Sequence, residues 1–172
     1  MKKKWLIAAI WVLGIAVCLS MMPWGRNISV QTAAFEYELD QEEPLAVHEV
    51  TIEGRYTFSL WGQDTFDGKL AISGFPDTQE LSAKVQFWPD HDYGMISYLD
   101  WAGQAHTKEP LYLYCSWDLQ QFSIVLLEIA QDGDQLSAQW NAETGRVLCA
   151  NASNYEQLKA YCEAVGLNLW EE

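Results

Sequence analysis

Two histidines and several carboxylates in the middle of the chain are the side chains best suited to bind a metal ion. Asp90, His91 and Asp92 follow one another, and His106 lies further along. Imidazole and carboxylate groups are typical ligands of zinc and other divalent ions. The intervening residues 93–101 read as a strand that spans about 30 Å when extended, so its two ends cannot share one ion without a sharp bend. The Pro-Asp-His-Asp sequence is also ordinary turn chemistry, so we expect a turn here, with no metal and no cofactor.

A second acidic group has the spacing of an EF-hand calcium loop. Asp132, Asp134 and Glu143 occupy the first, third and twelfth positions of such a loop. The sixth position, which needs glycine for its sharp turn, is Ser137, and no helical pattern flanks the segment. The sequence therefore predicts a hairpin turn rather than a calcium site.

Nucleophilic catalysis has no support in the sequence. There is no G-x-S-x-G elbow and no cysteine–histidine signature. Carboxylates are so numerous that no particular pair can be chosen as a glycosidase dyad. We therefore expect no catalytic residues and no enzyme. The alternative that stays open is a small wall-active or metal-dependent hydrolase using Asp90, His91 or Asp92.

The cysteines give little information about location or chemistry. Cys115, Cys149 and Cys162 follow the N-terminal region, an odd number without metal-type spacing. A bridge between Cys149 and Cys162 is conceivable, but the rise of a helix carries Cys162 away from the turn that follows Cys149. Buried free thiols are the expectation.

Aromatic residues supply the remaining candidate binding groups. Exposed indoles beside carboxylates could bind sugars, or a cationic ligand through cation–π contacts. The alternative, which the sequence favours, is that these rings cover the ends of a twisted sheet. The residues concerned lie at predicted strand ends, in turns, near the C-terminus or on one strand face: Trp61, Trp88, Trp101, Trp117, Trp140, Trp170, Tyr112 and Tyr114.

The charge balance excludes one class of partner. The chain has a formal net charge of −14, and three of its ten basic residues lie in the Lys2–Lys4 cluster, so the remainder is more acidic still. Such a surface repels phosphate backbones, so we expect no nucleic-acid partner. It suits a cationic ligand, although acidic surfaces also serve simply to keep a domain soluble.

The first 25 residues predict a membrane location. Three lysines precede an uncharged run over residues 5–22, which is about the length that crosses a bilayer. The expectation is a transmembrane anchor or signal segment over 1–25 in the cytoplasmic membrane, single-pass, with the C-terminal part extracytoplasmic. A cleaved signal and a lipidated Cys18 are the alternatives.

The rest of the chain must position these side chains. Residues 26–47 read as an acidic stalk, and 48–172 as one β-rich domain. Period-two alternation over 48–60, 65–73 and 81–87 predicts amphipathic strands, and more apolar strands follow. A capping box at Ser153 and a stripe from Leu158 to Val165 predict a final helix. The expected fold class is α+β: an antiparallel β-meander of about eight strands with one C-terminal helix packed on the sheet, preceded by one transmembrane helix.

Four segments carry a resemblance to a known group of proteins. These are residues 50–54 (VTIEG), 66–74 (FDGKLAISG), 111–114 (LYLY) and 122–125 (FSIV). Together they resemble small uncharacterised extracytoplasmic proteins of Gram-positive bacteria, which have an N-terminal membrane segment and a β-rich domain. The resemblance implies a fold but brings no function and no site residues.

Topology, acidity and the lack of catalytic motifs together favour one function. We expect a membrane-tethered binding or interaction module whose partner is an envelope protein or a cationic ligand. The membrane itself is expected to be a partner through the N-terminal helix.

Overall fold

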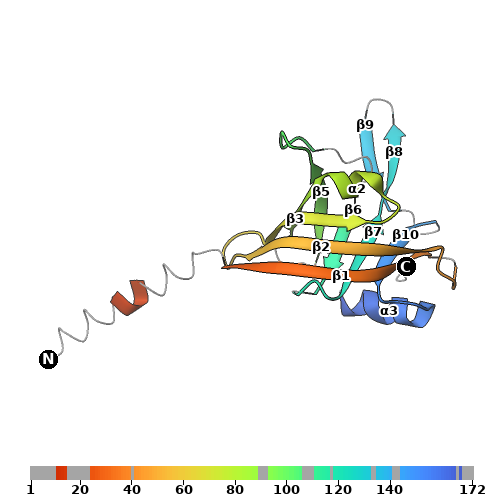
Figure 1. The fold of residues 1–172 in the computed structure, drawn as a ribbon, viewed down its shortest axis with the longest axis horizontal. Coiled ribbons are helices and arrows are strands. Elements are labelled where there is room, and N and C mark those ends of the chain that lie inside the picture. The colour runs from red at the N-terminus through yellow and green to blue at the C-terminus, as the bar shows by residue number, and fades with distance from the viewer. Residues whose placement is uncertain are drawn as a thin grey trace.

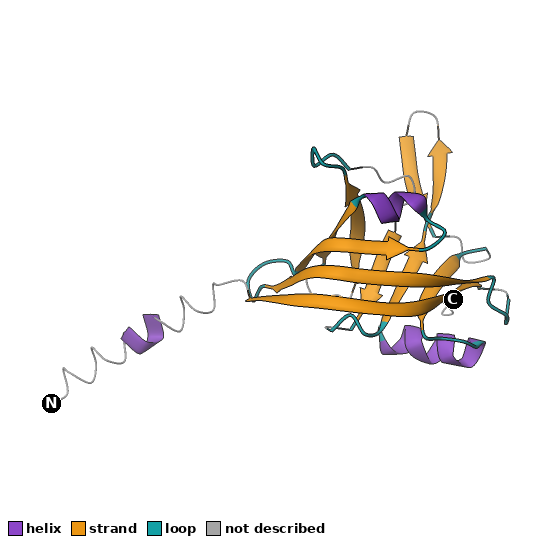
Figure 2. Cartoon of the chain, viewed as in Figure 1, coloured by secondary structure: helices purple, strands orange, loops and turns teal. Residues whose placement is uncertain are grey.

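The structure is a computed structural model, and it describes residues 11–14, 24–39, 41–88, 93–105, 111–116, 118–132, 135–140, 144–165 and 167. Its strands are β1 (Trp24–Glu38), β2 (Ala46–Phe58), β3 (Thr65–Ile72), β4 (Ser82–Phe87), β5 (Tyr93–Leu99), β6 (Leu111–Cys115), β7 (Phe122–Leu126), β8 (Glu128–Asp132), β9 (Gln135–Gln139) and β10 (Arg146–Ala150). Two helices, α2 (Pro76–Glu80) and α3 (Tyr155–Ala164), complete the fold. Figure 2 shows that strands make up most of the body.

Eight of these strands form a closed antiparallel barrel. Their order around the wall is β1-β10-β7-β6-β5-β4-β3-β2, and β1 also pairs with β2 (Figure 1). β8 and β9 form a separate two-stranded sheet. The predicted antiparallel β-meander is therefore wrong, because its strands close into a barrel. Residues alternate between two faces in a barrel wall as they do in an open sheet, so the alternation alone does not distinguish them.

The strand that closes the barrel comes from the segment predicted to be an acidic stalk. Residues 26–47 form most of β1 and the first residues of β2. β1 pairs with β2 from Trp24 opposite Phe58 to Glu36 opposite Ala46, and its last five residues also pair with β10. Ile28 and Ala34 on β1 are buried in the barrel core, so this acidic segment belongs to the domain itself.

The predicted membrane anchor over residues 1–25 is also corrected. Nowhere in the described part of the chain is there a helix with both the length and the apolar character that a bilayer crossing requires. Before β1, the structure describes residues 11–14 as helical, and Trp24 and Gly25 already belong to β1. The membrane as a partner and the single-pass extracytoplasmic location both depended on that helix, so neither has support from the structure.

Apolar side chains fill the barrel interior. The largest fully buried ones include Phe66, Ile52, Leu70, Ile72, Ile96, Leu111, Leu113, Leu119, Phe122, Ile124 and Leu148. Gly54 and Gly68 face each other on β2 and β3, where a Cβ on Gly68 would lie 2.2 Å from the carbonyl oxygen of Glu53. No real side chain fits at that distance, so the two glycines allow the strands to approach closely beside Phe66.

A second core joins the C-terminal helix to the outer wall of the barrel. α3 packs its buried Leu158 and Cys162 toward β7 and β10. The same cluster includes Tyr37, Val125, Val147, Cys149, Ala152, Val165 and Leu167. The helix begins one residue later than predicted: Asn154 is the N-cap, and its side-chain oxygen accepts a hydrogen bond from the Gln157 amide at 2.9 Å.

Candidate functional site

The residues singled out for metal binding give no metal site in the structure. Asp90, His91, Asp92 and His106 lie outside the described residues. So do Asp134 and Glu143 of the second acidic group, and Asp132 is the last residue of β8. In the ranges that the structure does describe, no three histidine, cysteine, aspartate or glutamate side chains gather where they could hold a metal ion.

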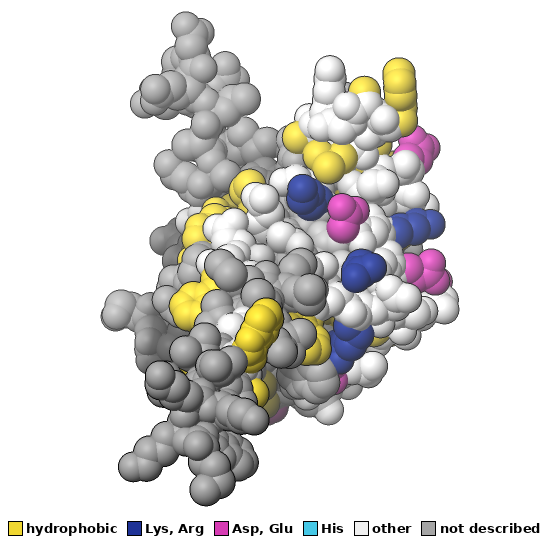
Figure 3. Space-filling view, turned by 90° about the vertical axis from the view of Figure 1, so that its left-hand side faces the viewer, with side chains coloured by type: hydrophobic (Ala, Val, Ile, Leu, Met, Phe, Trp, Pro, Cys, Tyr) yellow, Lys and Arg dark blue, Asp and Glu magenta, His cyan; other side chains and the backbone are white. Residues whose placement is uncertain are grey.

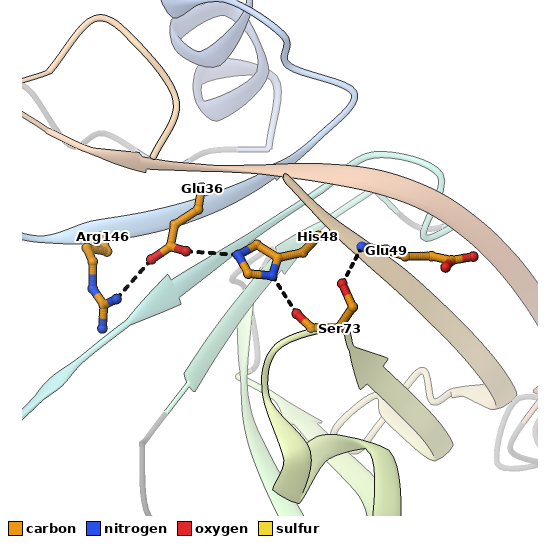
Figure 4. Close-up of polar contacts among 5 residues, drawn as sticks. All are labelled: Glu36, His48, Glu49, Ser73 and Arg146. Carbon is orange, nitrogen blue, oxygen red and sulfur yellow. Dashed lines mark hydrogen bonds and ion pairs between the residues drawn. The ribbon is translucent and has the colours of Figure 1, made fainter. Parts of the chain in front are cut away.

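A buried ionic cluster at one end of the barrel is the first candidate site. We call Glu36, His48, Ser73 and Arg146 the rim cluster. They lie near the end of β1, near the start of β2, just after β3 and at the start of β10. Figure 4 shows the Glu36 carboxylate between Arg146 and His48, with Ser73 on the other side of the imidazole. Glu36 is 5% exposed and His48 is 9% exposed.

Both carboxylate oxygens of Glu36 and both ring nitrogens of His48 have partners inside the protein. Arg146 donates to Glu36 Oε1 at 2.9 Å, and His48 Nε2 lies 2.9 Å from Glu36 Oε2. The other ring nitrogen, Nδ1, hydrogen-bonds to the Ser73 carbonyl oxygen. A carbonyl oxygen can only accept, so Nδ1 carries a proton. The Glu36 carboxyl thus lies between two basic side chains, Arg146 and His48.

The surrounding turn fixes the imidazole in place. Gly74 has φ +88°, and a Cβ there would lie 3.2 Å from the His48 ring. The Phe75 ring packs edge-on against the imidazole at a centroid distance of 5.4 Å. The Thr78 hydroxyl of α2 accepts from the Ile72 amide at 2.8 Å and ties the helix to the end of β3. His48 is therefore held in one orientation, and both of its ring nitrogens are occupied by contacts within the protein.

A group of packed aromatic rings on the outer wall is the second candidate site. Tyr93 and Met95 of β5 lie opposite Tyr114 and Tyr112 of β6, and Trp88 follows β4. We call these five residues the aromatic face. Trp88 is 37% exposed and Met95 is 41% exposed, while the three tyrosines are half-buried.

The rings of the aromatic face adopt two orientations. Tyr93 and Tyr114 stack at a centroid distance of 4.9 Å, with their planes 26° apart, and Trp88 lies 34° from Tyr93. Tyr112 stands nearly upright against this row, at 72° to Trp88 and 75° to Tyr93. The ring planes therefore lie in two directions at about a right angle, and Tyr112 and Tyr114 also pack against the second core.

Packing within the face also affects its phenols. Burial, together with the neighbouring Tyr93 and Tyr112, raises the pKa of the Tyr114 hydroxyl. Tyr114 is neutral at physiological pH, as an ordinary tyrosine is, and its raised pKa extends the neutral form further into the alkaline range. An uncharged phenol keeps the ring quadrupole available to a cation without adding an ionic charge of its own.

Only some of the predicted aromatic residues come together. Trp88, Tyr112 and Tyr114 share the aromatic face, whereas Trp61 and Trp101 are 77% and 99% exposed elsewhere. Trp140 is half-buried against the second core. Trp117 and Trp170 lie outside the described residues. Tyr93 is not among the aromatic residues predicted from the sequence, although its alternation with Met95 on a strand of period two is a signal that could have found it.

The wall formed by β2, β3 and β4 has a different character. Across β2 and β3, Glu53 lies opposite Lys69 and Arg55 opposite Asp67, and Asp67 in turn lies opposite Lys84 of β4. Opposite charges in these cross-strand positions attract one another modestly. Figure 3 shows basic and acidic side chains interspersed on the face turned toward the viewer. The charges of this wall are thus matched among themselves.

Comparison with known proteins assigns the chain to no group: no family model, no curated protein and no solved structure matches it. The resemblance to small extracytoplasmic proteins of Gram-positive bacteria therefore stays a prediction.

Proposed function

We propose that this protein is a binding module for a small organic cation, and that the aromatic face is its binding site. The observation that carries the proposal is a set of four mutually packed rings, partly exposed, on a chain with a net charge of −14. Ring faces attract cations through their quadrupole, and the attraction grows as the cation sheds water against an apolar surface.

The type of cation follows from the chemistry of the face. A methylated ammonium group is large, weakly hydrated and apolar at its surface, so it loses little on leaving water and gains contact with several rings. The exposed Met95 thioether adds a polarisable, adaptable contact beside them. The acidic surface of the molecule raises the local concentration of any cation, which adds to the attraction over a longer range.

Neutral sugars also stack on aromatic rings, so charge is the property to test. The experiment is isothermal titration of the full-length protein with choline and with 3,3-dimethylbutan-1-ol, which has the same shape without the charge. Choline is expected to bind with a dissociation constant in the low millimolar range, about −4 kcal/mol, and the neutral analogue at least tenfold more weakly.

Raising the salt concentration is expected to weaken choline binding, because salt screens the attraction of the acidic surface. Equal affinity for the neutral analogue would show an ordinary apolar patch, and no binding of either compound would remove the proposed function. The alternative hydrolase depends on Asp90, His91 and Asp92, which lie outside the described residues, and no described contact favours it.

A further inference from the structure

Two buried thiols meet beneath the C-terminal helix, in a part of the molecule that the proposed binding site does not use. Cys149 on β10 and Cys162 on α3 are both fully buried. The Ser123 hydroxyl of β7 lies 3.3 Å from the Cys149 sulfur and 3.9 Å from the Cys162 sulfur. The pair is close enough that each thiol shifts the pKa of the other. A single hydroxyl therefore holds both sulfurs together at the junction of helix and barrel.

The chain between the two cysteines explains how they come into contact. Asn151 follows β10 in a left-handed conformation, φ 58°, and its amide donates to the Ala33 carbonyl at 2.9 Å. Its side chain accepts from the Thr32 hydroxyl at 2.9 Å. This anchored turn brings the chain back so that α3 lies against the wall it has just left. The sequence expectation that helix rise separates Cys162 from Cys149 is therefore corrected, although both thiols are free and buried as expected.

The two sulfurs are chemically unequal. The hydrogen bond with Cys149 lowers the pKa of the Cys162 thiol, whereas the hydrogen bond with Cys162 and burial raise the pKa of the Cys149 thiol. A thiol whose pKa is lowered beside a second thiol is the arrangement in which the first sulfur, once deprotonated, reacts with an oxidant and the second completes the exchange.

We propose that Cys149 and Cys162 form a reversible intramolecular disulfide when the protein meets a hydroperoxide. The Cys162 thiolate attacks the peroxide oxygen and cleaves the O–O bond. This step gives a sulfenic acid and, after protonation, one water when hydrogen peroxide is the oxidant. The Cys149 sulfur then attacks the sulfenic sulfur, loses its proton, and releases the oxygen as a second water. Two thiols and one peroxide thus become one disulfide and two waters.

To form a disulfide, the two sulfurs must approach to the S–S bond length of about 2.0 Å from their positions beside one shared hydroxyl. Because both thiols are fully buried, the oxidant reaches them when the seam below α3 opens. The resulting bond ties the last helix to β10, and it leaves Cys115 in the barrel interior untouched.

The test is thiol counting and peptide mapping on the reduced full-length protein. The chain has four cysteines, so alkylation in denaturant is expected to label four thiols before treatment with hydrogen peroxide and two afterwards. Digestion without reduction is expected to give a linked Cys149–Cys162 peptide, and a dithiol reductant to restore all four thiols. The oxidised protein is expected to unfold at a temperature several degrees higher, because the bridge restrains the unfolded chain.

Matched variants locate the reaction. Cys162→Ser and Cys149→Ser are expected to lose the linked peptide, whereas Cys115→Ser is expected to keep it. Far-UV circular dichroism checks that each variant is folded, and alkylation of native wild-type protein with a small reagent checks that the seam opens. The proposal would be overturned if all four thiols remained after peroxide treatment although the alkylation check shows that the seam opens. A disulfide to Cys115, or a sulfinic acid on one cysteine without a disulfide, would also overturn it.

Discussion

At one end of the barrel, the rim cluster turns its polar atoms inward: both oxygens of Glu36 and both ring nitrogens of His48 are bonded within the protein. On the outer wall, the aromatic face leaves Trp88 37% exposed and Met95 41% exposed. Buried polar groups are often considered as candidate catalytic sites, but the oxygens of Glu36 and the ring nitrogens of His48 are already paired within the protein. The apolar rings, which look like packing material in a sequence, retain surface that a ligand can contact. The unsatisfied surface, rather than the presence of charge, distinguishes the candidate binding site from the structural cluster.

The largest expected effect is a loss of stability when the rim cluster, rather than the aromatic face, is altered. Glu36→Gln replaces the buried carboxyl that both Arg146 and His48 contact, so it is expected to lower the free energy of unfolding by about 2–4 kcal/mol. The expected loss is moderate because the Arg146 side chain is 46% exposed, so water compensates part of its lost contact. Chemical denaturation measures the change.

A matched control makes that result specific. Glu49→Gln alters an exposed carboxylate on β2, on the residue that follows His48. It is expected to change the free energy of unfolding by less than about 0.5 kcal/mol. Choline affinity is expected to stay the same in the folded Glu36→Gln protein. A variant as stable as the wild type would show that the rim cluster does not support the barrel.

The second effect is on binding. Trp88→Ala removes the most exposed ring of the aromatic face and is expected to weaken choline binding at least tenfold, which corresponds to about 1.4 kcal/mol. Stability is expected to change little, because a substantial part of this side chain is already in water. Trp101→Ala, which removes an indole that is 99% exposed, is the control and is expected to leave the affinity unchanged. Equal losses of choline affinity in the two variants would show that choline does not bind at the aromatic face.

Alkaline pH tests the contribution of a buried core tyrosine, Tyr98, to the stability of the barrel. Burial raises the pKa of Tyr98, whose hydroxyl donates to the Leu70 carbonyl at 3.0 Å. Above about pH 10 the unfolded chain loses this proton while the folded protein keeps it, so stability falls as pH rises. One such group contributes a slope of up to about 1.4 kcal/mol per pH unit. Tyr98→Phe is expected to be less stable at neutral pH but to have a shallower alkaline slope. Unfolding titrations at several pH values measure both, and an unchanged slope would contradict this role.

The smallest effect uses a cation–π contact already present in the chain. The Lys159 ammonium lies 4.6 Å from the centre of the Tyr155 ring on α3. Lys159→Met keeps the length of the side chain without the charge and is expected to lower stability by about 0.5 kcal/mol. Lys159→Arg is expected to retain most of it. No difference between the methionine and arginine variants would show that the half-buried Tyr155 ring attracts a cation too weakly to affect stability.

Part of this fold could be predicted because its signals are local. Alternation of Val50 and Ile52 with polar residues predicts β2, and apolar spacing from Leu158 to Val165 predicts α3, since each pattern depends only on near neighbours. Barrel closure depends on β1, where Glu36 points into the barrel end. A glutamate in an acidic run reads as solvated, and its partner Arg146 lies 110 residues away. No local pattern reveals that pair.

Only part of the candidate binding site could be predicted from the sequence, for a similar reason. Tyr112 and Tyr114 stand on one face of a single strand, so their proximity follows from the period of two. Tyr93 joins them through the register of β5 on β6, and Trp88 through the position of the chain after β4. Register between strands that are joined by a long connection is set by the whole barrel, so the sequence could not place these four rings together.

The most direct test of the central claim is to observe the aromatic face while choline is added. The chain has nine tryptophans, and each contributes one indole N–H signal to a nitrogen-15 correlation spectrum, in which Trp88→Phe identifies the Trp88 signal. We predict a saturable shift of the Trp88 signal at the same choline concentrations that titration calorimetry gives, with no shift for Trp101. Unchanged spectra, or equal shifts at all indoles, would contradict a cation site on the aromatic face.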